Sequence, residues 1–261
     1  RALLIELIKL SDNYFSLIPV YMSKEPGGYT LREANSFMKK IYPGIVPFVD
    51  HDRCVDLHPN DVYFSSELAC DLVLDAQKCG FYDHLIKNNV NITFMIHDIL
   101  PVTKNHFFPP GSNENFSVWL NTIVEYSDKI ICVTDAVVNE VKKYIDDNKL
   151  NNPRLHLEHS HHGADISSTI PSDGIDYHDA EKVALITQNL SFLMVGTLEP
   201  RKGHLQAIAA FEQLWASGNE AYLVIVGKEG WKGLPDDARR TIPEIVNKVK
   251  NHPLLNKKLF W

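Results

Sequence analysis

The feature that most constrains this chain is a repeated alternation between short apolar strands and helical segments. Several of the expected strands are nearly uninterrupted apolar runs, and helical patterns of about 10–15 residues separate the strands. Such strands suit parallel sheets covered on both faces, because strand–helix–strand connections place helices on the sheet. The sequence therefore predicts an α/β fold, with strands at 61–66, 91–97, 129–133, 191–196 and 221–227. Residues 155–165 are expected to form a strand that leads into a turn at Gly163.

A polar interval divides these strands into two groups. Residues 167–188 are rich in Ser, Asp, Thr and Gly and lack strong periodicity, which is typical of a linker. We therefore expect two parallel-sheet domains, residues 1–166 and residues 189–261, that face each other across a cleft. Ligands of open α/β sheets bind at the carboxyl ends of strands, so functional residues should follow the strands directly.

Composition and charge exclude several classes of function for this protein. The chain has 261 residues and a net charge of −7, which argues against a general binder of nucleic acid or anionic membranes. No apolar run approaches the ~20 residues that span a bilayer. The four cysteines lack metal-ligand spacing and are typical of reduced thiols, so a cytoplasmic protein is expected; they are Cys54, Cys70, Cys79 and Cys132.

The strongest chemical signal is the segment VGTLEPRKGH, residues 195–204, which lies between a strand and a helix. Gly196 permits a tight exit from the strand, and Arg201 and Lys202 place two cations beside the start of the helix. The helix dipole and the free N–H groups at a helix N-terminus also favour an anion, so this loop suits a diphosphate. A solvated basic turn is the alternative that the pattern leaves open.

His97 and Asp98 give a second signal, because they end an expected strand and should face the cleft. A neutral His97 can donate to a sugar hydroxyl or a phosphate oxygen. Asp98 can fix the tautomer of that histidine or accept from a substrate hydroxyl. A structural histidine that caps the turn is the alternative. Thr134 follows the next strand and is expected to cap the helix after it.

Two weaker patterns remain. The tract HLEHSHHG, residues 156–163, holds four histidines, but only Glu158 or Asp165 could complete a metal site. We favour a partly exposed strand edge and expect no metal. In VGKEGWKG, residues 226–233, the glycines are expected to shape a strand exit, with a ligand role for Lys228 or Glu229 as the alternative.

At this point a family resemblance becomes visible. The segments VGTLEPRKGHLQAIAAFEQLW and AYLVIVGKEGW closely resemble the second domain of retaining GT-B glycosyltransferases of family GT4, which includes mannosyl- and rhamnosyltransferases of bacterial polysaccharide assembly. FMIHDILP, FFPPG, DKIICVTDAVVNEV and HHGAD resemble consecutive pieces of the first domain. The resemblance covers most of residues 55–261. It implies two Rossmann-like domains, the first on the acceptor side and the second binding the donor.

The resemblance also implies roles for single residues. Lys202 matches the lysine that neutralises the leaving diphosphate, and Arg201 is the candidate for a second charge because Thr197 stands where many members carry arginine. His97 matches a histidine that contacts the donor sugar near the reacting carbon. The expected catalytic residues are thus His97, Asp98, Arg201 and Lys202, and the expected donor-binding residues are Gly196, Thr197, Glu199, Thr134 and Gly227.

The activity implied is transfer of a hexose, mannose first, from a nucleotide sugar such as GDP-mannose to a glycan or lipid-linked acceptor with retention. The leaving phosphate can accept the acceptor proton on the same face, so no enzymic nucleophile, metal or further cofactor is needed. Peripheral association with the inner face of the membrane or with other glycosyltransferases fits this role. The alternatives are a non-catalytic GT-B scaffold that binds a partner glycosyltransferase or glycan, and a nucleotide-sugar epimerase.

The two ends of the chain carry further expectations. RALLIELIKL has the pattern of a helix already under way, and KLFW resembles the start of a strand. The family pattern includes a strand and a glycine-containing loop before this helix and a paired-glutamate segment after KLFW. We therefore expect both domains to be incomplete here. Near the first end, Thr30 and Glu33 form a capping box that predicts a helix to about Lys40.

Overall fold

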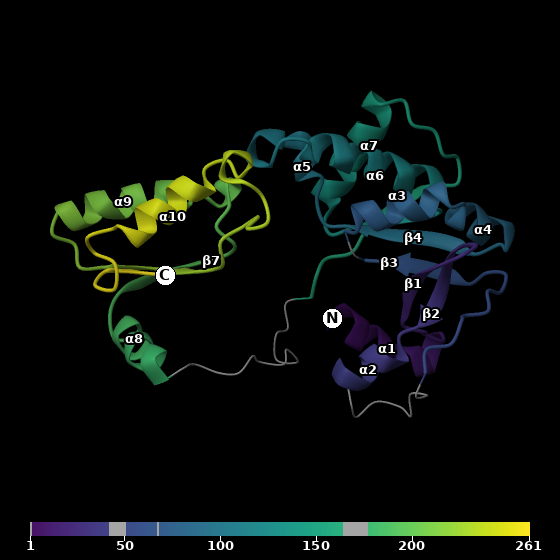
Figure 1. The fold of residues 1–261 in the computed structure, drawn as a ribbon, viewed down its shortest axis with the longest axis horizontal. Coiled ribbons are helices and arrows are strands. Elements are labelled where there is room, and N and C mark those ends of the chain that lie inside the picture. The colour runs from purple at the N-terminus through teal and green to yellow at the C-terminus, as the bar shows by residue number, and fades with distance from the viewer. Residues whose placement is uncertain (1, 42–50, 67, 164–176) are drawn as a thin grey trace. The chain divides into compact units, whose positions relative to one another are not determined.

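The computed structural model describes residues 2–41, 51–66, 68–163 and 177–261. The chain divides into two compact units, and each contains a parallel sheet (Figure 1). Unit 1 comprises residues 1–99 and 115–169, and unit 2 comprises residues 100–114 and 170–261. The predicted fold class, α/β with two parallel sheets, is therefore confirmed. The cleft between the domains stays a prediction.

Unit 1 contains a four-stranded parallel sheet in the order β3–β4–β5–β6. Phe94 pairs with Ser65 on one side and with Ile130 on the other, so the strands run in close register. Their carboxyl ends therefore meet at one edge of the sheet, where ligands of such sheets bind. The strands are β3 (Val62–Ser65), β4 (Asn91–Ile96), β5 (Lys129–Cys132) and β6 (His156–His159).

Helices connect these strands, and each helix buries one face against the sheet. Trp119, Leu120 and Ile123 are almost fully buried, because their spacing places them on one face of α6. Thr134 caps α7 as predicted, and its hydroxyl accepts a hydrogen bond from the backbone N–H of Val137 at 3.2 Å. The helices are α3 (Cys70–Lys78), α4 (Phe81–Lys87), α6 (Ser112–Tyr126) and α7 (Asp135–Asp147).

The predicted helix that ends near Lys40 is present, but its predicted start at a capping box of Thr30 and Glu33 is wrong. Both residues lie in a strand that pairs antiparallel with the strand before it, and the next helix begins only at Asn35. The carboxylate of Glu33 forms an ion pair with Arg53 instead of capping a helix. Cross-strand pairing thus outweighs a local capping signal. The elements here are α1 (Ala2–Tyr14), β1 (Val20–Glu25), β2 (Gly28–Glu33) and α2 (Asn35–Ile41).

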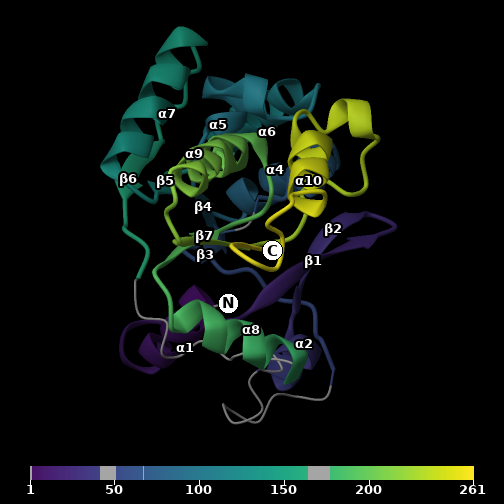
Figure 2. The same cartoon turned by 90° about the vertical axis from the view of Figure 1, so that its left-hand side faces the viewer.

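Unit 2 contains a three-stranded parallel sheet in the order β7–β8–β9, with two helices over one face (Figures 1 and 2). Leu223, Ile225 and Leu259 belong to the same buried cluster as Ile208 and Ile245 of those helices. The strand predicted from KLFW is present as β9. The elements are β7 (Ser191–Val195), α9 (His204–Ala216), β8 (Tyr222–Val226), α10 (Ile242–Lys250) and β9 (Leu259–Phe260).

The opposite face of β7 is exposed within the described residues. Leu193 and Val195 are 65% and 69% exposed, so the expectation that both faces of this strand are covered is wrong here. Side chains alternate across a strand, and Met194 between them packs against the buried cluster on the helix side. The apolar run therefore has one partly buried face, toward the helices, and one exposed face.

Two further segments belong to unit 2. Helix α5 (Leu100–Thr103) and the 3₁₀ helix η1 (Asn105–Phe107) belong to it although they precede α6 in the chain. The interval expected as a linker includes helix α8 (Tyr177–Thr187), whereas residues 167–176 lie outside the described residues. Within the described residues, no helix is both long enough and apolar enough to cross a membrane.

Candidate functional site

Two glycines at the ends of β7 and β8 form the base of the candidate site in unit 2. The backbone N–H of Gly196 donates to the carbonyl of Val226 at 2.9 Å, and Gly196 has a φ of +150°, which side-chain-bearing residues rarely adopt. A Cβ on Gly227 would lie 1.9 Å from the carbonyl oxygen of Gly196. The backbone therefore requires residues without a side chain at Gly196 and Gly227, the two glycines predicted to bind the donor.

The side chain of Lys202 lies over the point where the backbones that follow β7 and β8 meet. A Cβ on Gly196 would be 3.7 Å from both Cδ and Cε of Lys202. The side chain is exposed, and no ion pair joins its ammonium to another described residue. Lys202 ends the 3₁₀ helix η2 (Pro200–Lys202), and Gly203, with a φ of +73°, then turns the chain into α9. The ammonium is thus held near the carboxyl end of β7.

Arg201 points to a different partner. Its Nε lies 3.0 Å from Oε2 of Glu199, a carboxylate with a side chain only 13% exposed. The structure therefore brings Arg201 and Glu199 together and leaves Lys202 without a carboxylate among the described residues. Thr197 is exposed, and its Cγ2 lies 3.2 Å from where a Cβ on Gly230 would stand. The loop after β7 thus packs on the loop after β8.

Arg239 organises the loop after β8, and sequence reasoning missed it. Its buried guanidinium donates to the Glu229 carboxylate at 2.5 Å, to the Gly230 carbonyl at 3.0 Å and to Asp236 at 3.0 Å. The hydrogen bond from Arg239 holds the pKa of the Glu229 carboxyl below its usual value. Glu229 therefore has a structural partner, which favours a role in loop shape over the ligand role left open for it.

His97 carries the candidate chemistry in unit 1, at the carboxyl end of β4. Its Nε2 lies 3.2 Å from the carbonyl oxygen of Ser66, and its Nδ1 lies 3.0 Å from Nε2 of His162. Because a carbonyl only accepts, Nε2 of His97 carries a hydrogen, and in the neutral form of the ring Nδ1 is then the acceptor. His162 must then donate. The two rings are stacked, with centroids 5.1 Å apart.

The other unit 1 candidates lie at the same edge of the sheet. Thr134 is half-buried and uses its hydroxyl to cap α7, and Asp98 is half-buried directly after His97. The histidine tract is exposed, with His159 and His161 in edge-to-face contact. In the part of the chain that the structure describes, no group of three or more His, Cys, Asp or Glu side chains could hold a metal ion.

The first comparison with known proteins is a match to a family model. Residues 178–240, which include β7, the Lys202 loop and β8, match the family model described as "Glycosyl transferases group 1". This match falls on the two segments that carry the resemblance in the sequence. The predicted resemblance to group 1 glycosyltransferases is therefore confirmed.

Comparisons with single proteins give more detail than the family model does. Serotype-specific mannosyltransferase WbdA of Escherichia coli, in three sequence forms, is 33% identical over 264 aligned residues, which cover 100% of this chain. The chain spans about 30% of the length of these relatives. A solved structure of alpha,alpha-trehalose 6-phosphate synthase from Burkholderia multivorans has a TM-score of 0.48 and 15% identity. That comparison covers 73% of this chain and 42% of that chain.

Proposed function

We propose that this chain is part of a retaining glycosyltransferase that moves mannose from GDP-mannose to a glycan or lipid-linked acceptor. The observation that carries the proposal is the 33% identity to a mannosyltransferase along the whole chain. The exposed ammonium of Lys202, held over Gly196 at the end of a parallel strand, supports it because a leaving diphosphate needs a cation there.

The chemistry follows from where charge develops. As the bond between the sugar and the donor phosphate breaks, negative charge grows on the leaving diphosphate, and Lys202 stabilises it. Arg201 adds a weaker positive field, since Glu199 already offsets part of its charge. The acceptor oxygen then bonds to the anomeric carbon on the same face of the sugar, and its proton passes to the leaving phosphate. Retention results without a carboxylate nucleophile.

His97 contributes a contact to the donor sugar in this proposal. Both of its ring nitrogens already have partners, Ser66 and His162. A backbone carbonyl is fixed by the strand end, whereas the His162 side chain is exposed and follows β6. A hydroxyl group of the donor sugar therefore takes the place of His162 and donates a hydrogen bond to Nδ1 of His97.

The test is transfer activity of the protein with Lys202→Ala, assayed with GDP-mannose. Loss of one electrostatic stabiliser of this kind should reduce turnover by at least ~10²-fold. Lys257→Ala is the matched control, because Lys257 is an exposed lysine outside the site. Near-normal turnover in Lys202→Ala would overturn the proposal. Absence of transfer in every form of the protein would favour a non-catalytic scaffold.

A further inference from the structure

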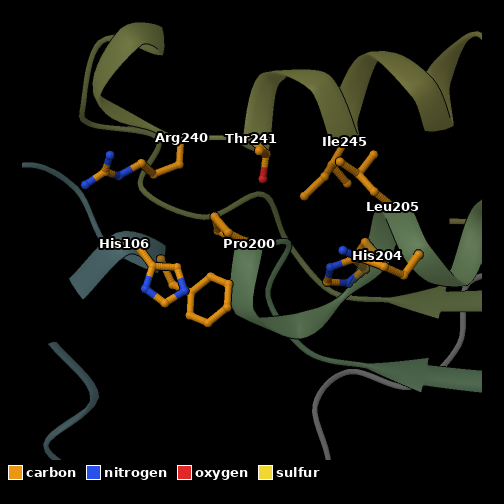
Figure 3. Close-up of a pocket in the computed structure, with 9 residues that line it drawn as sticks. His106, Pro200, His204, Leu205, Arg240, Thr241 and Ile245 are labelled. Carbon is orange, nitrogen blue, oxygen red and sulfur yellow. The ribbon is translucent and has the colours of Figure 1, made fainter. Parts of the chain in front are cut away.

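Phe108 is fixed to the loop after β8 by two residues that lie far from it in the sequence. Arg240 donates through Nε to the carbonyl oxygen of Phe108 at 2.5 Å, and the centroids of the Phe108 and Trp231 rings are 6.3 Å apart. Figure 3 shows the Arg240 side chain extending toward the segment that carries His106. We call these two contacts the Phe108 clamp. Both lie within unit 2, because residues 100–114 belong to that unit.

The loop that carries the clamp has an unusual backbone at both contact residues. Trp231 has a φ of +46° and Arg240 a φ of +55°, and residues with large side chains rarely adopt a positive φ. Such conformations persist only where the surrounding structure fixes them, and they gather at functional sites. Here the buried guanidinium of Arg239 fixes the loop through its hydrogen bonds to other residues of the same loop. The loop thus holds Trp231 and Arg240 in place at a cost in conformational energy.

The clamped segment lies beside the loop that carries Lys202. Phe107 lines a cavity of about 320 Å³ together with Pro200, and it lines a second cavity of about 210 Å³ together with Arg201. Pro200 and Arg201 belong to η2, the 3₁₀ helix that ends at Lys202. The clamp therefore keeps η1, which contains Phe107, next to the candidate diphosphate contact.

The same segment is the direct continuation of the strand end that carries His97. Only Asp98 and Ile99 separate His97 from Leu100, the first residue of α5, so the α-carbons of His97 and Leu100 are at most about 11 Å apart. Ile99 is almost fully buried and belongs to unit 1. The connection from His97 to the clamped segment is therefore short and is held at both of its ends.

We propose that Arg240 and Trp231 are positioning residues for the transfer reaction. By fixing Phe108, they keep the short connection from His97 beside the Lys202 loop. The inference rests on the proposed function, in which one donor molecule contacts His97 through its sugar and Lys202 through its diphosphate. Release of the clamp leaves each residue in its own unit but no longer fixes the two contacts on one donor. A misplacement of about 1 Å in a reacting geometry can cost about 10²-fold in rate.

Amide hydrogen exchange measures whether the clamp holds the segment. Backbone N–H groups of residues 100–108, that of Phe108 among them, donate to carbonyls of the same segment. In Arg240→Gln their exchange should become about 10-fold faster, the effect of one lost hydrogen bond from a charged donor. Exchange in α9 should not change, because the buried cluster of unit 2 stays intact. Lys257→Ala, at an exposed lysine outside the loop, is the control. Equal exchange of residues 100–108 in Arg240→Gln and in the unchanged protein would overturn the proposal.

Kinetics with GDP-mannose separate positioning from a merely structural role. Arg240→Gln and Phe108→Ala should each lower kcat by about 10- to 100-fold. The affinity for GDP, measured by calorimetry, should stay unchanged, because GDP has no sugar to contact His97. Arg240→Lys should recover most of the activity, since its ammonium can donate to the same carbonyl. A loss of GDP affinity as large as the loss of kcat would overturn the proposal. If the unchanged protein transfers no mannose, the proposed function fails, and the exchange measurement alone decides whether Arg240 holds the segment.

Discussion

The α-carbon of Gly227 lies against the carbonyl oxygen of Gly196, so close that a Cβ on Gly227 would stand 1.9 Å from that oxygen. The exits of β7 and β8 therefore cross at a point where neither residue has a side chain. Lys202 lies on this crossing through its aliphatic chain. The position of the candidate diphosphate contact thus depends on a contact between two backbones.

We predict that Gly227→Ala lowers the free energy of unfolding by at least about 1–3 kcal/mol, because the backbone must move to admit the methyl group. Gly233→Ala is the matched control, since no heavy atom lies within 4 Å of a Cβ placed there. Urea unfolding measures both. Equal stability of the two variants would show that the strand exits do not cross as described.

The pair of Glu229 and Arg239 predicts a dependence of stability on pH. Arg239 lowers the pKa of the Glu229 carboxyl below its reference value of 4.5. The stabilisation is therefore present above the unfolded pKa and is lost as pH falls through the lowered folded pKa. Between about pH 5 and pH 3, unfolding free energy should fall less in Glu229→Gln than in the unchanged protein.

The control for this pH dependence is Asp237→Asn. Asp237 is an exposed carboxylate in the same region for which no ion pair occurs among the described residues. Its removal should leave the slope of stability against pH almost unchanged. If Asp237→Asn and Glu229→Gln change the slope equally, the ion pair with Arg239 does not determine it.

The contact between His97 and His162 predicts a defined tautomer. Nitrogen NMR of the histidine rings should find the hydrogen of His97 on Nε2, because that atom faces the carbonyl of Ser66. His162→Ala should leave stability within about 0.5 kcal/mol, since both rings are exposed. It should change the signal of Nδ1 of His97, whereas His84→Ala, at an exposed histidine on α4, should not. A hydrogen on Nδ1 of His97 would contradict the assignment.

The sequence predicts well those features that depend on neighbouring residues. The strand, loop and helix around Lys202 follow from an apolar run, glycines and an amphipathic segment within 26 residues, 191–216. The N-cap at Thr134 is equally local. The capping box at Thr30 failed because pairing with a neighbouring strand is a tertiary contact that outweighs the local signal.

Contacts between distant or unpatterned residues could not be predicted. His97 and His162 are 65 positions apart, and nothing in either segment marks the other as its partner. Arg239 lies in a polar loop with no periodicity, and only the fold shows that it is buried against Glu229 and Gly230. The exposed face of β7 also escapes pattern analysis, because a continuous apolar run does not distinguish one covered face from two.

A transfer assay of the protein with GDP-, UDP- and dTDP-linked hexoses, with the anomeric configuration of the product determined by NMR, tests whether this chain belongs to a retaining mannosyltransferase. We expect transfer from GDP-mannose, a product with the anomeric configuration of the donor, and a loss of turnover of at least ~10²-fold in Lys202→Ala. Transfer with inverted configuration, or no transfer from any donor, would contradict this assignment.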